Sequence, residues 1–275
     1  MFPHDGILGL SPDVDGDDYL TLGVPMPVHM KRKKRINRAI VSLDMKKGDD
    51  QTSTFELGKI STDKFRYKNE QESDLGWVSV KTNTTRFSWR SEMKNIFYNR
   101  TSFNDTKFED KSIDDGFQNM AVFDSFYGGI HLPVTEWKPL MNMEKASLKA
   151  KGIDLNCNMK TFSCYYEGQC QPDKFSSFGF NFVGDRAYIL QPKDYLIQNG
   201  NSNGLDICQI AIYGNKINAT EYILGDVFMQ NFYVIMDYEN SRFAINGVYT
   251  PVKEIGTKGY RDPDIYDEDG QRKDQ

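Results

Sequence analysis

Short segments that mix β-branched, aromatic and polar residues dominate the chain after about residue 40. Runs of this length and composition are typical of β-strands. Two of them, 178–182 and 187–190, flank Gly184 and Asp185, a pair suited to a tight hairpin turn. The polar stretch 238–241 is expected to turn the chain between two further strands. The expected strands are 39–43, 54–57, 76–81, 85–90, 178–182, 187–190, 207–213, 232–237 and 242–248.

Helical periodicity is sparse. It is clearest over 134–151, where apolar residues recur at helical spacing. Pro139 lies near the start of this segment, where proline is tolerated, and Gly152 is suited to end it. A shorter helix is expected over 27–38, and a single helical turn over 228–232. The pattern as a whole predicts a mainly β protein.

Composition excludes several classes of protein. The 275 residues carry 34 Lys and Arg against 39 Asp and Glu, a net charge of −5, which gives no drive towards nucleic acid or anionic membrane. Hydrophobic residues make up 39% of the chain, which favours a packed core. No apolar run approaches the roughly 18 residues that a membrane span needs. The tail 259–275 is mostly charged or polar and is expected to be disordered.

The cysteines favour disulfide bonds over a metal site. No CxxC pair is present and no histidine lies nearby, so support for a metal site is weak. An even number of cysteines fits two disulfides, which allow three connectivities, whereas four buried free thiols are the alternative. The four candidates are Cys157, Cys164, Cys170 and Cys208.

Four N-x-[ST] sequons accompany these cysteines and are candidates for glycosylation. They begin at Asn83, Asn99, Asn104 and Asn218. Together with the cysteines they indicate an extracytoplasmic lineage. The amino-terminal residues lack the basic start and long apolar stretch of a signal peptide. One explanation for this mismatch is a chain that is incomplete at its amino terminus.

Other patterns carry less chemistry. The basic run 31–35 fits a nuclear localisation signal or an anion-binding patch, but more simply the solvated face of the short helix. The acidic stretch 13–18 lacks the glycine and glutamate positions of a calcium loop and is expected to be a surface loop. The three histidines are scattered and no G-x-S-x-G segment occurs, so triad chemistry has no support.

Four segments, in order, resemble the pepsin-like aspartic peptidase family. The segment 5–10 reads DGILGL, and 55–60 is similar to the strand and turn before the crossover between the two lobes of that family. The segment 121–125 is similar to the approach to the second catalytic aspartate. The segment 223–228, ILGDVF, is followed by Asp237 and Asn240 as in the carboxy-terminal part of the family. The resemblance covers about residues 5–250.

The resemblance implies a bilobal, mostly antiparallel β fold that cleaves peptides or unfolded proteins. Each lobe of a complete member supplies one D-[TS]-G loop, and the two aspartates share one proton because like charges so close cannot both ionise. A mobile hairpin, the flap, closes over the substrate, and no cofactor is needed. The resemblance also implies that Cys208 pairs with one of the earlier three cysteines. The family suggests a secretory, lysosomal or vacuolar compartment.

This sequence departs from the family pattern at both aspartate loops. No D-[TS]-G triplet occurs, so the first aspartate and the flap are expected to be missing. The second loop reads Asp124-Ser125-Phe126-Tyr127. Ser125 is compatible with the family, whereas Phe126 replaces a glycine, where a side chain can clash or exclude an allowed backbone shape. Tyr127 replaces a small hydroxyl residue, so the loop as written is expected to be catalytically incompetent.

These expectations divide the chain into a remnant of the amino-terminal lobe, 1–62, a nearly complete carboxy-terminal lobe, 63–258, and the tail 259–275. Asp124 is the surviving catalytic candidate, and the chain alone is expected to be inactive. One hypothesis is an aspartic endopeptidase completed by a missing upstream segment or a second chain. Another is a non-catalytic homologue that holds a peptide or protein in an open half-cleft beside Phe126 and Tyr127. A third is a truncated gene product.

Overall fold

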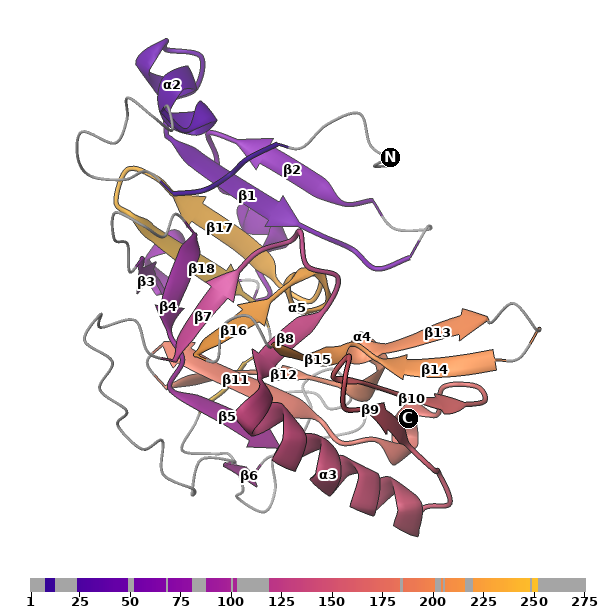
Figure 1. Cartoon of the computed structure of the whole chain (residues 1–275). Helices are drawn as coiled ribbons and strands as arrows, with labels where there is room; N and C mark the ends of the chain where they lie inside the picture. Colours follow the sequence, from indigo (N-terminus) through magenta and orange to yellow (C-terminus); the bar gives the residue numbers. More distant parts are fainter. Residues whose placement is uncertain are drawn as a thin grey trace.

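The computed structural model describes residues 8–12, 24–48, 52–67, 69–80, 88–99, 101–102, 119–183, 185–200, 204, 206–215, 220–247 and 249–251. Its strands form four sheets, and one long helix, α3 (Val134–Ala150), packs against them (Figure 1). The architecture is mainly β and agrees with a pepsin-like aspartic protease fold.

The first sheet pairs strands from the first 60 residues with strands from the carboxy-terminal part of the described chain. Its strand order is β2-β1-β17-β18-β3, and every neighbouring pair is antiparallel. Strands from the two predicted lobes therefore share one sheet, while the boundary at residue 62 stays a prediction. The strands are β1 (Ile40–Asp44), β2 (Thr54–Leu57), β3 (Val78–Ser79), β17 (Tyr233–Asp237) and β18 (Arg242–Asn246).

A second sheet, of order β15-β8-β16-β7-β4, mixes parallel and antiparallel pairs. Strand β16 lies between β7 and β8, parallel to the first and antiparallel to the second. The carboxyl end of β16 therefore lies beside the carboxyl end of β7 and the start of β8. The strands are β4 (Trp89–Glu92), β7 (Met120–Phe123), β8 (Ile130–Pro133), β15 (Ile212–Asn215) and β16 (Glu221–Leu224).

The two remaining sheets complete the structure. One has the order β19-β12-β11-β5-β6, and the other β13-β14-β10-β9. Their strands are β5 (Asn95–Tyr98), β6 (Thr101–Ser102), β9 (Asn156–Asn158), β10 (Ser163–Glu167), β11 (Phe178–Val183), β12 (Arg186–Leu190), β13 (Leu196–Gly200), β14 (Asp206–Ile210) and β19 (Tyr249–Pro251). The short helices are α2 (Met26–Arg32), α4 (Pro192–Tyr195), α5 (Asp226–Met229) and three 3₁₀ turns, η1 (Thr62–Lys64), η2 (Glu72–Asp74) and η3 (Pro172–Lys174).

Most predicted elements are confirmed, with corrections. The helical turn predicted over 228–232 lies at Asp226–Met229, and the strand predicted over 85–90, which begins outside the described residues, is β4 at Trp89–Glu92. The hairpin of β11 and β12 and the long helix α3 lie where the sequence indicated. The helix predicted over 27–38 is shorter, because α2 ends at Arg32 and Lys34 takes a left-handed φ of 54°. The strand predicted over 207–213 is two strands, β14 and β15. Between them the Ala211 amide donates to the Tyr195 carbonyl (2.8 Å), so it takes no part in either strand. The strand predicted over 76–81 shrinks to Val78–Ser79.

All four cysteines are paired, in the disulfides Cys157–Cys164 and Cys170–Cys208. The alternative of four free thiols is therefore wrong, and the partner of Cys208 is Cys170. Among the sequon asparagines, Asn99 is exposed in the turn after β5. Asn83, Asn104 and Asn218, the acidic stretch 13–18 and the tail 259–275 lie outside the described residues. No helix in the described ranges is long and apolar enough to cross a membrane.

Candidate active site

Asp124 lies on the tight loop that joins β7 to β8, at the end where β16 crosses between them. Its backbone amide donates to the Leu224 carbonyl (3.4 Å), and its own carbonyl accepts from the Tyr127 amide (3.2 Å). The Phe126 amide donates to Oδ1 of Asp124 (3.0 Å). The residue before it, Phe123, is buried and packs its ring 4.5 Å from that of Phe243. The core thus holds one end of the loop, and a backbone amide orients the carboxylate.

The loop closes over Gly225, at the end of β16. The Gly225 amide donates to the Gly129 carbonyl (3.0 Å), and the Asp226 amide donates to the Tyr127 carbonyl (2.9 Å). A Cβ placed on Gly225 would lie 2.2 Å from the Tyr127 oxygen and 2.3 Å from the Gly129 oxygen. Real Cβ contacts are never this short, so only glycine allows the loop to approach β16 this closely.

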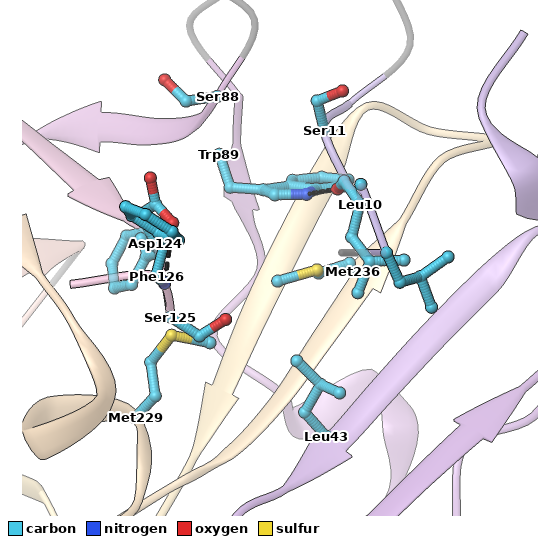
Figure 2. Close-up of a pocket in the computed structure, with 13 residues that line it drawn as sticks. Leu10, Ser11, Leu43, Ser88, Trp89, Asp124, Ser125, Phe126, Met229 and Met236 are labelled. Carbon is cyan, nitrogen blue, oxygen red and sulfur yellow. Dashed lines mark hydrogen bonds between the residues drawn. The ribbon is translucent and has the colours of Figure 1, made fainter. Parts of the chain in front are cut away.

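The Asp124 side chain faces a pocket of about 350 Å³ (Figure 2). Across the pocket lies the segment 8–11, whose Leu10 carbonyl accepts from Trp89 Nε1 (2.6 Å) and from the Tyr238 hydroxyl (2.8 Å). The described lining residues are Leu8, Gly9, Leu10, Ser11, Leu43, Ser88, Trp89, Phe123, Asp124, Ser125, Phe126, Met229 and Met236. Asp124 is the one ionisable side chain in this described lining.

Comparison with known proteins identifies the family of this fold and loop. The family model described as eukaryotic aspartyl protease matches residues 1–248. The chain belongs to the eukaryotic aspartyl protease family. The two disulfides and the loop between β7 and β8 are therefore features of one member of this family.

Individual curated relatives share limited sequence identity with this chain. Over 104 residues, 36% of this chain and 24% of the relative, the chain is 35% identical to "Aspartic protease 3" of Caenorhabditis elegans. It is 20% identical to the "Probable aspartic-type endopeptidase CTSD" of Arthroderma otae, over 89% of this chain and 55% of the relative. It is 22% identical to Plasmepsin I of Plasmodium falciparum, over 86% of this chain and 44% of the relative. The chain thus spans about half the length, or less, of these curated relatives.

Phe126 takes a backbone conformation that does not require glycine, where the sequence led us to expect a clash or an excluded backbone shape; the expected loss of catalytic competence stays a prediction. Its φ is not in the left-handed region, so a side chain adds no backbone strain there. The ring points outward and is 68% exposed. The hydrogen bond to the Asp124 carboxylate comes from a backbone amide, which every residue except proline has. Phe126 therefore donates it as a glycine would. Ser125 is exposed and also lines the pocket.

The Phe126 ring lies on the border of a second pocket, of about 390 Å³. A row of aromatic rings runs from Phe126 through Tyr127 and His131 to Tyr213, with centroid separations of 6.1, 5.2 and 5.1 Å. Burial lowers the pKa of His131 below its usual value, so its ring is neutral at neutral pH. The exposed Phe126 ring and the three half-buried rings form an uncharged aromatic surface next to Asp124. The sequence suggested Phe126 and Tyr127 for this surface but gave no sign of His131 or Tyr213.

The other two carboxylates of the family motifs hold the backbone. Asp237 is 1% exposed and accepts from the amides of Glu239 (3.1 Å) and Asn240 (3.2 Å) and from Arg242 Nε (2.9 Å). Asp226 accepts from the Val227 amide (2.6 Å), and burial raises the pKa of its carboxyl. Neither carboxylate lines the pocket of Asp124. No cluster of three or more potential metal ligands occurs among the described residues.

Proposed function

We propose that this chain contributes Asp124 as one of the two carboxylates of an aspartic endopeptidase site that cleaves peptides or unfolded proteins. The observation that supports this most directly is the placement of Asp124, oriented by the Phe126 amide at the edge of an open pocket. In such a site one carboxylate accepts a proton from the attacking water while the other, protonated, polarises the scissile carbonyl. Asp124 can perform one of these two roles at a time.

The second carboxylate has to come from another segment, either of the same polypeptide or of a second chain. The triplet Ile-Leu-Gly occurs twice in the sequence, at 7–9 and at 223–225. The second copy lies under the Asp124 loop, with the carbonyls of that loop against Gly225. No described atom lies within 4 Å of the position that a Cβ would take on Gly9. We propose that a loop bearing the second aspartate packs on Gly9 as the Asp124 loop packs on Gly225.

Cleavage of an unfolded protein at acid pH tests this function. The endogenous protein is purified, its intact mass and amino-terminal sequence are measured, and its activity is compared with that of the 275-residue chain. We expect cleavage by a species that contains a D-[TS]-G loop in addition to the Asp124 loop, and loss of cleavage in its Asp124→Asn variant. The exposed Asp173, in η3, gives the matched control Asp173→Asn, which should keep full activity. Cleavage that survives Asp124→Asn would refute the assignment.

A second candidate function, peptide binding without cleavage, is favoured by the exposed ring of Phe126 and the row of half-buried rings beside it. Exposed aromatic side chains beside a pocket are typical anchors for apolar groups of a partner. Peptide affinity measured by fluorescence anisotropy should fall in Phe126→Ala and stay unchanged in Tyr165→Ala, which removes an exposed ring from β10. Binding that is lost in Phe126→Ala, with no cleavage at any pH by the endogenous protein, would favour this candidate over the enzyme. Equal affinity in both variants would exclude it.

A further inference from the structure

Five consecutive basic residues, 31–35, lie on the surface where α2 ends. Within this basic segment, residues 32–35 read Arg-Lys-Lys-Arg. All five residues are exposed, and the left-handed φ of Lys34 turns the chain away from the helix axis. The function proposed above makes no use of this segment.

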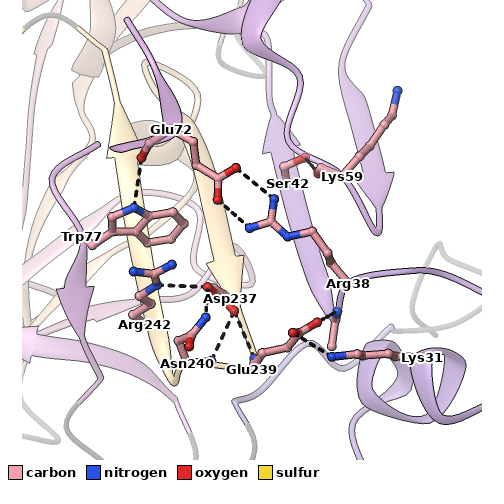
Figure 3. A network of polar contacts seen from close by, with 11 residues as sticks. Lys31, Arg38, Ser42, Lys59, Glu72, Trp77, Asp237, Glu239, Asn240 and Arg242 are labelled. Carbon is pink, nitrogen blue, oxygen red and sulfur yellow. Dashed lines mark hydrogen bonds and ion pairs between the residues drawn. The ribbon is translucent and has the colours of Figure 1, made fainter. Parts of the chain in front are cut away.

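Ion pairs fix the chain at Lys31, the first residue of the basic segment, and at Arg38, beyond its end (Figure 3). On the amino-terminal side, Lys31 pairs with Glu239 at 2.7 Å. On the carboxy-terminal side, the guanidinium of Arg38 donates to both carboxylate oxygens of Glu72 (2.9 and 2.5 Å). The Ala39 amide also donates to Glu239 (2.5 Å). Between these two fixed points the chain forms turns, in which the amides of Lys33, Lys34 and Arg35 donate to carbonyls of residues 29–31 (3.0, 2.8 and 2.9 Å) and the half-buried Ile36 lies against Gly58.

The helix that leads into these turns is held weakly. It has seven residues, of which Pro27 is the one that is buried, and no side chain caps its amino terminus. Helices this short are marginal unless packing supports them. Endopeptidases require an extended conformation of the chain that they cut, so this segment has to open locally. Opening breaks the hydrogen bonds of the amides 33–35 but none of those that pair β1 with β17 and β2.

We propose that the peptide bond after Arg35 is a processing site for an endopeptidase that recognises paired basic residues. Hydrolysis consumes one water and leaves a carboxylate on Arg35 and an amine on Ile36. The ammonium and guanidinium groups of residues 32–35 match the acidic subsites of such an enzyme. The two disulfides are typical of chains that fold in an oxidising compartment, where exposed extracytoplasmic loops meet processing enzymes. The proposal does not depend on the chemistry of Asp124.

The cut pieces are expected to stay together. Lys31 lies before the cut, and its partner Glu239 lies after it. Leu10 also lies before the cut and accepts hydrogen bonds from Trp89 and Tyr238, which lie after it. Processing would therefore release the covalent link between the pocket wall at 8–11 and β1 while these contacts persist.

The chain offers an internal control, because Lys46 and Lys47 form another basic pair in the described residues. Both are exposed, but Lys46 pairs with Asp44 (2.6 Å) and Lys47 Nζ donates to the Lys193 carbonyl (2.8 Å). The folded 275-residue chain is treated with a serine endopeptidase that cleaves after paired basic residues, and the products are followed by mass spectrometry. We expect the cut after Arg35 to be at least about tenfold faster than the cut after Lys47, because proteolysis follows the population of the open segment. In urea-denatured chain both sites should be cut.

Two variants complete the experiment. Arg35→Gln should abolish the early cut, whereas Lys47→Gln should leave it unchanged. The nicked protein should run as two bands in denaturing gels and as one species in native size exclusion. An Arg35–Ile36 bond that is cut in the denatured chain but survives in the folded chain would overturn the proposal. So would initial cleavage after Lys47, or an endogenous protein whose chain is never found to begin at Ile36.

Discussion

Replacing Glu136 with glutamine is expected to remove most of a pH dependence of folding stability. Glu136 lies in the first turn of α3 and accepts a hydrogen bond from the buried Tyr222 hydroxyl of β16. Its second oxygen, Oε2, is buried and has no hydrogen-bond partner among the described residues. Burial raises the pKa of Glu136 to about 7, against an ordinary value of 4.5, although the bond from Tyr222 lowers it in part. Folding therefore favours the protonated form of this carboxyl.

The sign and size of the effect follow from this pKa. Between about pH 4.5 and pH 7 the folded chain keeps a proton that the unfolded chain has released, so stability falls as the pH rises through this window. Above this window the full loss of folding stability is present. A pKa of about 7 in the folded chain in place of 4.5 corresponds to a loss of about 3 kcal/mol. Glutamine stays neutral, so the variant lacks this loss.

Urea unfolding of the wild type and Glu136→Gln at about pH 5 and pH 8 measures the effect. The free-energy change caused by the substitution should differ between the two pH values by about 3 kcal/mol, in favour of the variant at pH 8. Any constant cost of the buried amide cancels in this difference. Glu144, on the same helix, accepts from Tyr98 (2.6 Å) and the Ser176 amide (3.0 Å), so Glu144→Gln should destabilise the protein at pH 8 by about 1–3 kcal/mol. Equal effects of Glu136→Gln at both pH values would refute the reasoning.

Further substitutions, at the site and elsewhere in the fold, are tested by urea unfolding. Gly225→Ala should lower the free energy of unfolding by about 2–3 kcal/mol, because the new Cβ meets two carbonyl oxygens. Gly9→Ala should change it by less than about 0.5 kcal/mol, because the space beside Gly9 is open among the described residues. Similar costs would contradict the asymmetry of the two Ile-Leu-Gly triplets. Asp237→Asn should cost about 3 kcal/mol because Arg242 loses its buried acceptor, and a neutral effect would show that this carboxylate is dispensable. Removing the disulfide that spans 38 residues should cost about 4 kcal/mol, and the one that spans 7 about 2 kcal/mol; the reverse order would exclude the loop-entropy account.

Local patterns in the sequence predicted the long helix, the hairpin of β11 and β12 and the motif around Asp124, because period, turn chemistry and motif letters are all local. Contacts over long sequence separations were beyond such patterns. Glu136 and Tyr222 are 86 positions apart, and no spacing rule pairs them. The contact of Leu10 with Trp89 and Tyr238 likewise depends on how the sheets pack, so the far wall of the pocket appeared only in the structure.

Phe126 shows how a motif comparison can misjudge a site. A glycine in a motif is needed either for its backbone freedom or for the absence of a side chain. At Phe126 the backbone conformation suits any residue, and the amide still donates to Asp124. At Gly225 the reverse holds, because the carbonyls of the aspartate loop occupy the place of a Cβ. The Phe126 ring is exposed beside Asp124 and is not needed for the amide bond to the carboxylate. Under the function that we propose, cleavage needs a second carboxylate, and the proposed place for its loop is Gly9.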